Sequence, residues 1–241
     1  MRLKISLLSP ADSFEIDLNH SYHLASAIYR AIERADPSLS IELHKPDVPK
    51  FFTFSKLFIP KRKFRIEGEK MVSDCEEAYF FFSTLRNEVA ASLVEGLLSK
   101  PEIRICGVDF IVSEVSVLPE REVKGREKFV TLSPIYASTS VGENGRRRIF
   151  DLYPKDSKFY EVILQNLVKK YVLYYKSAPE NLDFHMKPLN VKAKRIRLKD
   201  TFHRCVEMVF KAEGSPELLD VGYKAGFGSK NSMGFGMVKV V

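Results

Sequence analysis

The sequence has few cysteines, and the three present, Cys75, Cys106 and Cys205, lie far apart. None forms a C-x-x-C pair, which disfavours a disulfide framework or a zinc ribbon and is typical of a reducing compartment. No apolar run approaches the roughly 20 residues that a membrane span needs. Residues 1–8 alternate polar with apolar side chains, which indicates a strand and not a signal peptide. We therefore expect a cytoplasmic protein without a membrane partner.

The motifs of several common enzyme classes are also missing. The sequence contains no H-E-x-x-H, no paired-carboxylate motif and no G-x-S-x-G. Metalloprotease, two-metal nuclease and serine hydrolase functions therefore lack support. His20 and His23, three residues apart, are interpreted as helix-end residues or RNA contacts and not as metal ligands. We expect neither a metal nor a cofactor.

The composition is that of a folded, basic protein. Of 241 residues, 45% are hydrophobic, so the chain can bury one large core or two small ones. The net charge is +7 and the pI is about 9.2. A basic globular chain favours an acidic partner, most commonly nucleic acid. The alternative is a solvated surface with surplus lysines.

The first half of the sequence predicts the order β-α-β-β-α-β. A helix over 20–35, capped by Asn19, has an apolar stripe at i, i+3, i+4 spacing, and so does a helix over 87–99. Residues 45–77 are predicted to be irregular and basic. The predicted strands are residues 1–8, 40–43, 78–84, 103–106 and 109–118.

The second half partly repeats this order. It predicts a helix over 156–175 and a short helical turn over 216–220. Its predicted strands are residues 129–139, 146–150, 189–198, 203–212 and 235–241. Residues 119–127 are charged and contain one proline and one glycine, as expected of a linker. The fold prediction is α+β, with two tandem ferredoxin-like domains over residues 1–120 and 127–241.

The end of the chain is rich in glycine: five of twelve glycines lie between residues 222 and 236. Glycine lets a backbone approach a ligand closely, and exposed N–H groups can hold phosphate oxygens. Lys224 and Lys230 add positive charge. The spacing fits neither a dinucleotide fingerprint nor a P-loop. A purely structural turn before the last strand is the alternative.

Gly226-Phe227-Gly228, followed after five residues by Gly234-Phe235-Gly236, resembles the C-terminal signature loop of CRISPR-associated RAMP proteins. The closest similarity is to their repeat-processing endoribonuclease branch. The resemblance extends to N-H-x-x-x-L-x-x-x-I-Y from Asn19, to Leu43-His44 followed by Pro49-Lys50, and to T-L-S-P over 131–134. It implies two ferredoxin-like domains, in agreement with the pattern above, and one cut near the 3′ end of each CRISPR repeat.

RNA can be cut without a metal by its own 2′-hydroxyl, which attacks the adjacent phosphorus and leaves a 2′,3′-cyclic phosphate and a 5′-hydroxyl. The reaction needs a base, an acid and a cation. The resemblance implies that Tyr29 and His44 are catalytic. We assign Tyr29 as base, His44 as acid and Lys50 as electrostatic stabiliser, the first two being exchangeable. The alternatives are a core-packed tyrosine, an exposed loop histidine and a solvated lysine.

Residues 191–199 read V-K-A-K-R-I-R-L-K, and the basic positions change parity between Lys194 and Arg195. A strand does this only with a bulge or a change of burial. Such a strand can place cations along an RNA backbone, as can Arg146–Arg148; solvated strand faces are the alternative. The predicted RNA-binding residues are Lys192, Lys194, Arg195, Arg197, Lys199, Gly226, Gly228, Lys230, Gly234 and Gly236.

Three functions remain open. The leading prediction is an endoribonuclease that makes guide RNA units from single-stranded or weakly structured repeat RNA. The second is a non-catalytic repeat-RNA-binding protein, or a structural subunit of a CRISPR effector complex. The third is a basic domain that binds double-stranded DNA. Other CRISPR-associated proteins as partners, and a homodimer, are also left open.

Overall fold

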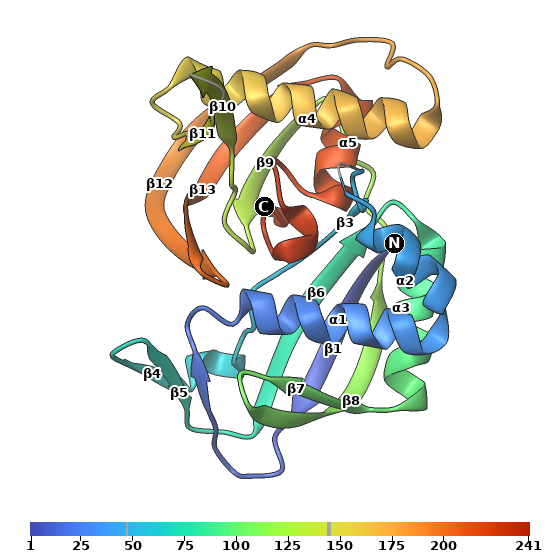
Figure 1. The fold of residues 1–241 in the computed structure, drawn as a ribbon, viewed down its shortest axis with the longest axis vertical. Helices are drawn as coiled ribbons and strands as arrows, with labels where there is room; N and C mark the ends of the chain where they lie inside the picture. The colour runs from blue at the N-terminus through green and yellow to red at the C-terminus, as the bar shows by residue number, and fades with distance from the viewer. Residues whose placement is uncertain (47, 144–145) are drawn as a thin grey trace.

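A five-stranded antiparallel sheet forms the N-terminal half of the computed structural model, which describes residues 1–46, 48–143 and 146–241 (Figure 1). Helices α1 (Ser21–Ala35) and α3 (Asn87–Ser99) pack side by side against this sheet. Along the chain, these two helices and the strands of the sheet follow one another as strand, helix, strand, strand, helix, strand, strand. The strands, from one edge to the other, are β3 (Phe52–Phe54), β6 (Glu77–Thr84), β1 (Arg2–Leu8), β8 (Val108–Leu118) and β7 (Glu102–Ile105).

Apolar periodicity explains both helices of this half. In α1 (Ser21–Ala35) the buried residues include Leu24, Ile28 and Ile32, which recur at i+4 and so form one stripe. In α3 (Asn87–Ser99) the helix axis comes so close to α1 that a Cβ on Gly96 would lie 1.8 Å from the carbonyl oxygen of Ala31. Only glycine permits this approach.

The C-terminal half repeats the arrangement with a four-stranded antiparallel sheet. Its order is β12 (Phe184–Leu198), β13 (Thr201–Gly214), β9 (Arg126–Thr131) and β14 (Val238–Val240). The helices are α4 (Ser157–Tyr175) and α5 (Pro216–Ala225), and the hairpin β10 (Ser138–Glu143) with β11 (Arg146–Asp151) precedes α4. The predicted α+β class with two ferredoxin-like domains is confirmed. The boundaries at 1–120 and 127–241 stay a prediction.

Several local predictions were wrong. Residues 40–43 are not a strand but part of α2 (Pro37–His44), because the Asp36 side chain accepts from the Leu39 N–H and Pro37 stands at the first turn. His20, and not Asn19, occupies the N-cap position of α1, because the Asn19 side chain accepts from the Arg197 N–H instead.

The segment over 45–77 is more regular than predicted. It contains β3, the short 3₁₀ turn η1 (Pro60–Arg62), β4 (Phe64–Glu67) and β5 (Lys70–Ser73), of which β4 and β5 join β2 (Glu15–Asp17) in a small sheet. These strands have only three or four residues, too few to give a readable period. The bulge in β12 lies at Pro188/Asn190 and not at 194/195, where the register is continuous and the side chains are mostly exposed.

Direct contacts join the two halves. The buried guanidinium of Arg2 donates to the Val238 carbonyl at 2.6 Å and lies 4.1 Å from the Tyr223 ring centroid. The Lys56 ammonium pairs with the Glu207 carboxylate across the same junction. Among the described residues, no helix has the length and apolarity required to cross a membrane.

Candidate active site and RNA-binding surface

Tyr29 and His44 are brought together from different helices. Tyr29 lies on α1 and His44 is the last residue of α2, and their ring centroids are 4.9 Å apart. The Phe52 ring of β3 packs against the Tyr29 ring edge to face, with their centroids 5.7 Å apart. His44 is exposed and Tyr29 is half-buried, so both rings border the surface. This pair can therefore reach a bound ligand together.

The backbone fixes the orientation of the His44 ring. Its Nδ1 lies 2.7 Å from the Ser40 carbonyl oxygen, one helical turn earlier. Because a carbonyl oxygen only accepts, Nδ1 carries the hydrogen in this bond. In the neutral ring Nε2 is then an acceptor, free to take a proton.

Tyr29 has a different environment. Burial raises the pKa of its phenol, and a hydrogen bond with the Ser232 side chain acts in the opposite direction. Ser232 lies in the short 3₁₀ turn η2 (Asn231–Met233) of the glycine-rich segment, about 200 residues away along the chain. No periodicity or spacing in the sequence indicated this contact, so Ser232 was not predicted.

Lys50 lies six residues after His44, on the segment that leads into β3. It is half-buried, and its ammonium donates to the Lys45 carbonyl. The pKa of Glu42 is lowered mainly by a hydrogen bond from Arg86, with smaller contributions from the charges of Lys45 and Lys50. Glu42 lies on the last turn of α2, so Lys50 is at the same end of that helix as His44.

The predicted RNA-binding glycines form the connection between α5 and β14. Gly226, Gly228, Gly234 and Gly236 are all buried. The N–H groups of Gly226, Gly234 and Gly236 donate to backbone carbonyls within the protein. These three donors are therefore already used, and contact of the glycines with RNA stays a prediction. Lys230, between them, is exposed.

Polar side chains that the sequence did not single out hold this loop in place. Asn231 is buried, and its Nδ2 donates to the carbonyls of Phe227 at 3.1 Å and Phe235 at 3.0 Å. The Thr53 hydroxyl of β3 donates to the same Phe235 carbonyl at 2.8 Å. The loop is thereby attached to the strand that also supports Tyr29.

Lys170 of α4 is the third such side chain, and it is unusual because it is 4% exposed. Its ammonium donates to the carbonyls of Gly226 at 2.6 Å and Gly228 at 3.2 Å. Burial lowers its pKa from 10.5 to about 7. A neutral amine keeps two N–H groups, enough for both carbonyls.

This burial predicts a pH dependence of stability. Between pH 7 and 10.5 the unfolded chain holds a proton on Lys170 that the folded chain releases. The free energy of unfolding of the wild type should therefore rise with pH across this window, relative to Lys170→Met, by up to about 1.4 kcal/mol per pH unit. Denaturant unfolding of both proteins at pH 7 and 9 measures the difference. If the unfolding free energies of the two proteins change with pH in parallel, Lys170 does not have a lowered pKa in the folded protein.

The predicted basic strand is the outer half of β12 and its turn into β13. Lys194 pairs with Glu207 at 3.6 Å. The Arg197 N–H donates to the Asn19 side chain at 3.1 Å, which places the turn against the start of α1. Lys192, Arg195, Arg197 and Lys199 are exposed and Lys194 is half-buried. The side chains of Arg146 and Arg147 lie outside the described residues; Arg148 is exposed.

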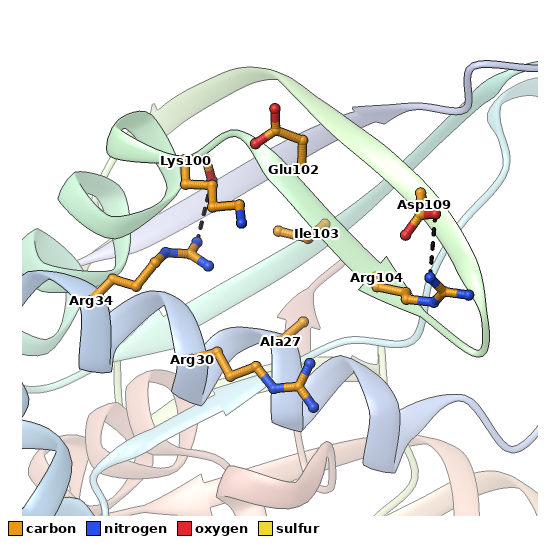
Figure 2. Close-up of a pocket in the computed structure, with 8 residues that line it drawn as sticks. All are labelled: Ala27, Arg30, Arg34, Lys100, Glu102, Ile103, Arg104 and Asp109. Carbon is orange, nitrogen blue, oxygen red and sulfur yellow. Dashed lines mark hydrogen bonds and ion pairs between the residues drawn. The ribbon is translucent and has the colours of Figure 1, made fainter.

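A basic pocket of about 260 Å³ lies between α1 and β7 (Figure 2). Arg30 and Arg34 extend into it from α1, and Arg104 pairs with Asp109 at its rim. Arg34 is also bound to the Gly96 carbonyl at 2.8 Å. None of the predicted site residues lines this pocket.

Comparisons with known proteins agree over the whole chain. The family model "CRISPR-associated protein Cas6, N-terminal" matches residues 15–116, and "CRISPR associated protein Cas6, C-terminal" matches residues 118–240. The CRISPR-associated endoribonuclease Cas6 1 of Methanocaldococcus jannaschii is 41% identical over 98% of this chain and 92% of its own length. The CRISPR-associated endoribonuclease Cas6 of Pyrococcus furiosus is 39% identical over 100% and 90%.

A solved structure described as "An RAMP protein binding different RNA substrates" superposes with a TM-score of 0.92 at 28% identity. The alignment covers 100% of this chain and 99% of that one.

Proposed function

This chain belongs to the Cas6 family of CRISPR-associated proteins, and from that membership we propose that it is an endoribonuclease that cuts CRISPR repeat RNA without a metal ion. The observation that carries the proposal is the contact between the Tyr29 and His44 rings, 4.9 Å apart at the surface. A phenol and an imidazole side by side supply the acid and the base that cleavage by the 2′-hydroxyl needs.

The proposed roles are the reverse of those assigned from the sequence: His44 is the base and Tyr29 is the acid. The His44 Nδ1–H is engaged with the Ser40 carbonyl, which leaves Nε2 to take the proton of the 2′-hydroxyl. Tyr29 has a raised pKa and stays protonated at neutral pH, which supports donation of its proton to the departing 5′-oxygen. The Lys50 ammonium stabilises the extra negative charge of the phosphorane.

The 2′-oxygen forms a bond to phosphorus as the bond from phosphorus to the 5′-oxygen breaks. One proton leaves to His44 and one arrives from Tyr29. The products are a 2′,3′-cyclic phosphate and a 5′-hydroxyl, and the RNA fragments are the guide units.

The test is incubation of the protein with repeat RNA in excess EDTA. We expect a single cut, a 5′-end that polynucleotide kinase labels without prior phosphatase treatment, and no cut when the nucleotide before the scissile bond carries a 2′-deoxyribose. Protein prepared identically with His44→Ala controls for contaminating ribonuclease. Tight RNA binding without cleavage would contradict the proposed endoribonuclease activity and indicate a non-catalytic repeat-RNA-binding protein. Stronger binding to double-stranded DNA than to RNA would contradict both of these functions.

A further inference from the structure

A second pocket, of about 370 Å³, lies where the β12–β13 turn meets the start of α1. Residues of both halves line it: Tyr22 and His23 come from α1, and Arg197, Lys199 and Phe202 come from the turn and the strands on either side of it. The bond from the Arg197 N–H to the Asn19 side chain joins its two walls. The pocket is therefore already formed without a ligand.

In this region two aromatic rings each lie close to a cationic side chain. The Arg195 guanidinium lies 3.9 Å from the centroid of the Phe202 ring, which is 47% exposed. The Lys199 ammonium lies 5.5 Å from the centroid of the Tyr22 ring. Exposed rings combined with cations are the surface on which unpaired bases stack in single-strand-binding proteins.

The charge of the pocket favours a base over a phosphate. Asp17, Glu69 and Asp200 line it together with Arg197 and Lys199, so carboxylates offset the cations. Carboxylates repel a phosphate but accept hydrogen bonds from the amino and imino groups of a base.

The spacing along α1 relates this pocket to Tyr29. Tyr22 and Tyr29 are seven residues apart, which places them on one face of the helix and about 10 Å apart along its axis. Tyr22 packs against the buried cluster that contains Phe235 of the glycine-rich segment, and Met233 packs against the same cluster. Ser232, the neighbour of Met233, contacts Tyr29. At about 3.4 Å per stacked nucleotide, 10 Å corresponds to about three nucleotides.

We infer that this pocket binds one unpaired nucleobase of the RNA, within about three nucleotides of the scissile linkage. The inference rests on the proposed function, because it takes the linkage at Tyr29 and His44 as the reference point. The base stacks on Phe202 or Tyr22 and donates to the carboxylates, and so sets the position of the strand in the site.

The test measures binding of the full chain, in EDTA, to a panel of repeat RNAs with a 2′-deoxyribose at the cleaved nucleotide. Each RNA carries one abasic nucleotide within three positions of the cut. We expect Phe202→Leu to weaken binding of the intact RNA about tenfold or more. One abasic position should cost the wild type as much, and should cost Phe202→Leu nothing further, since the same contact is lost in both.

Phe150→Leu is the matched control, because Phe150 is 41% exposed and has the Arg148 guanidinium 5.1 Å from its centroid, but lies outside the pocket. It should bind like the wild type. Tyr22→Leu provides the second variant, with its melting temperature measured alongside. Equal affinities of Phe202→Leu and Phe150→Leu, or additive losses at every abasic position, would overturn the inference. Cleavage is measured in a separate assay in EDTA. A protein that binds RNA without cutting it would still lose affinity on Phe202→Leu, so failure of the proposed function and failure of this inference are distinguishable.

Discussion

His44→Ala should lower the single-turnover rate of RNA cleavage by at least about a hundredfold and leave RNA affinity nearly unchanged. A positioned acid or base contributes roughly 10²–10⁴-fold to a rate, and alanine removes both ring nitrogens. The fold should tolerate the change, because His44 is exposed and the folded state loses its bond to the Ser40 carbonyl, worth about 1 kcal/mol, together with its ring contact with Tyr29.

Single-turnover cleavage under saturating protein, with RNA affinity measured by filter binding, separates the two effects. His185→Ala is the matched control, because His185 is an exposed histidine of β12 that the proposed mechanism does not use. It should cut at the wild-type rate. Near-wild-type cleavage by His44→Ala would refute the assignment of His44, and an equal loss in both variants would show that the effect is not specific to this site.

Gly236→Ala should destabilise the protein by about 3 kcal/mol or more and should also slow cleavage. Gly236 has a φ of +78°, a left-handed conformation that costs an L-residue roughly 1–2 kcal/mol. Its Cβ would lie 2.0 Å from the Phe227 carbonyl oxygen and 2.6 Å from the Asn231 side chain. Overpacking of this kind typically costs a further 1–3 kcal/mol.

The slower cleavage follows from the displacement of the loop that the added Cβ of Gly236→Ala would cause. Asn231 closes the loop through its bonds to Phe227 and Phe235, and Ser232 is the next residue. If the clash moves Asn231, the Ser232 side chain leaves the Tyr29 hydroxyl.

A thermal melt should show a decrease of at least about 6 °C for Gly236→Ala. Gly107→Ala separates strain from clash, because Gly107 has a φ of +86° but nothing within 4 Å of an added Cβ. Its melting temperature should decrease by only about one third as much, and its cleavage rate should not change. Equal decreases for the two variants would show that the packing of the loop contributes nothing.

Long apolar repeats made most of the fold predictable. The helix over Asn87–Ser99 was predicted to the residue, because its stripe runs for three turns and Lys100-Pro101 follows it. The short elements were not predictable. Residues 40–43 join a helix because of a cap at Asp36 and a buried Leu39 and Leu43, and four residues carry too little periodicity to show this.

The residues of the candidate site also fall into a predictable and an unpredictable group. Tyr29, His44 and Lys50 stand in motifs that resemble a known family, so the sequence could nominate them. Thr53 and Lys170 stand in no motif, and Ser232 is one of the five unspecified residues inside the glycine-rich loop. Each of the three contributes through a partner that is more than 50 residues distant along the chain. Nothing in local spacing reports such a pairing.

The sequence by itself determined the α+β class, the two ferredoxin-like domains, the basic character and the residue types available for acid–base chemistry. Those properties follow from periodicity and composition, which are local. Only the tertiary structure decided that α1 and α2 bring a phenol and an imidazole to 4.9 Å, that the glycines are buried, and that Tyr22 and Phe202 border one pocket. Such distances depend on how helices and sheets pack against each other, and packing is set by contacts between residues far apart in the chain.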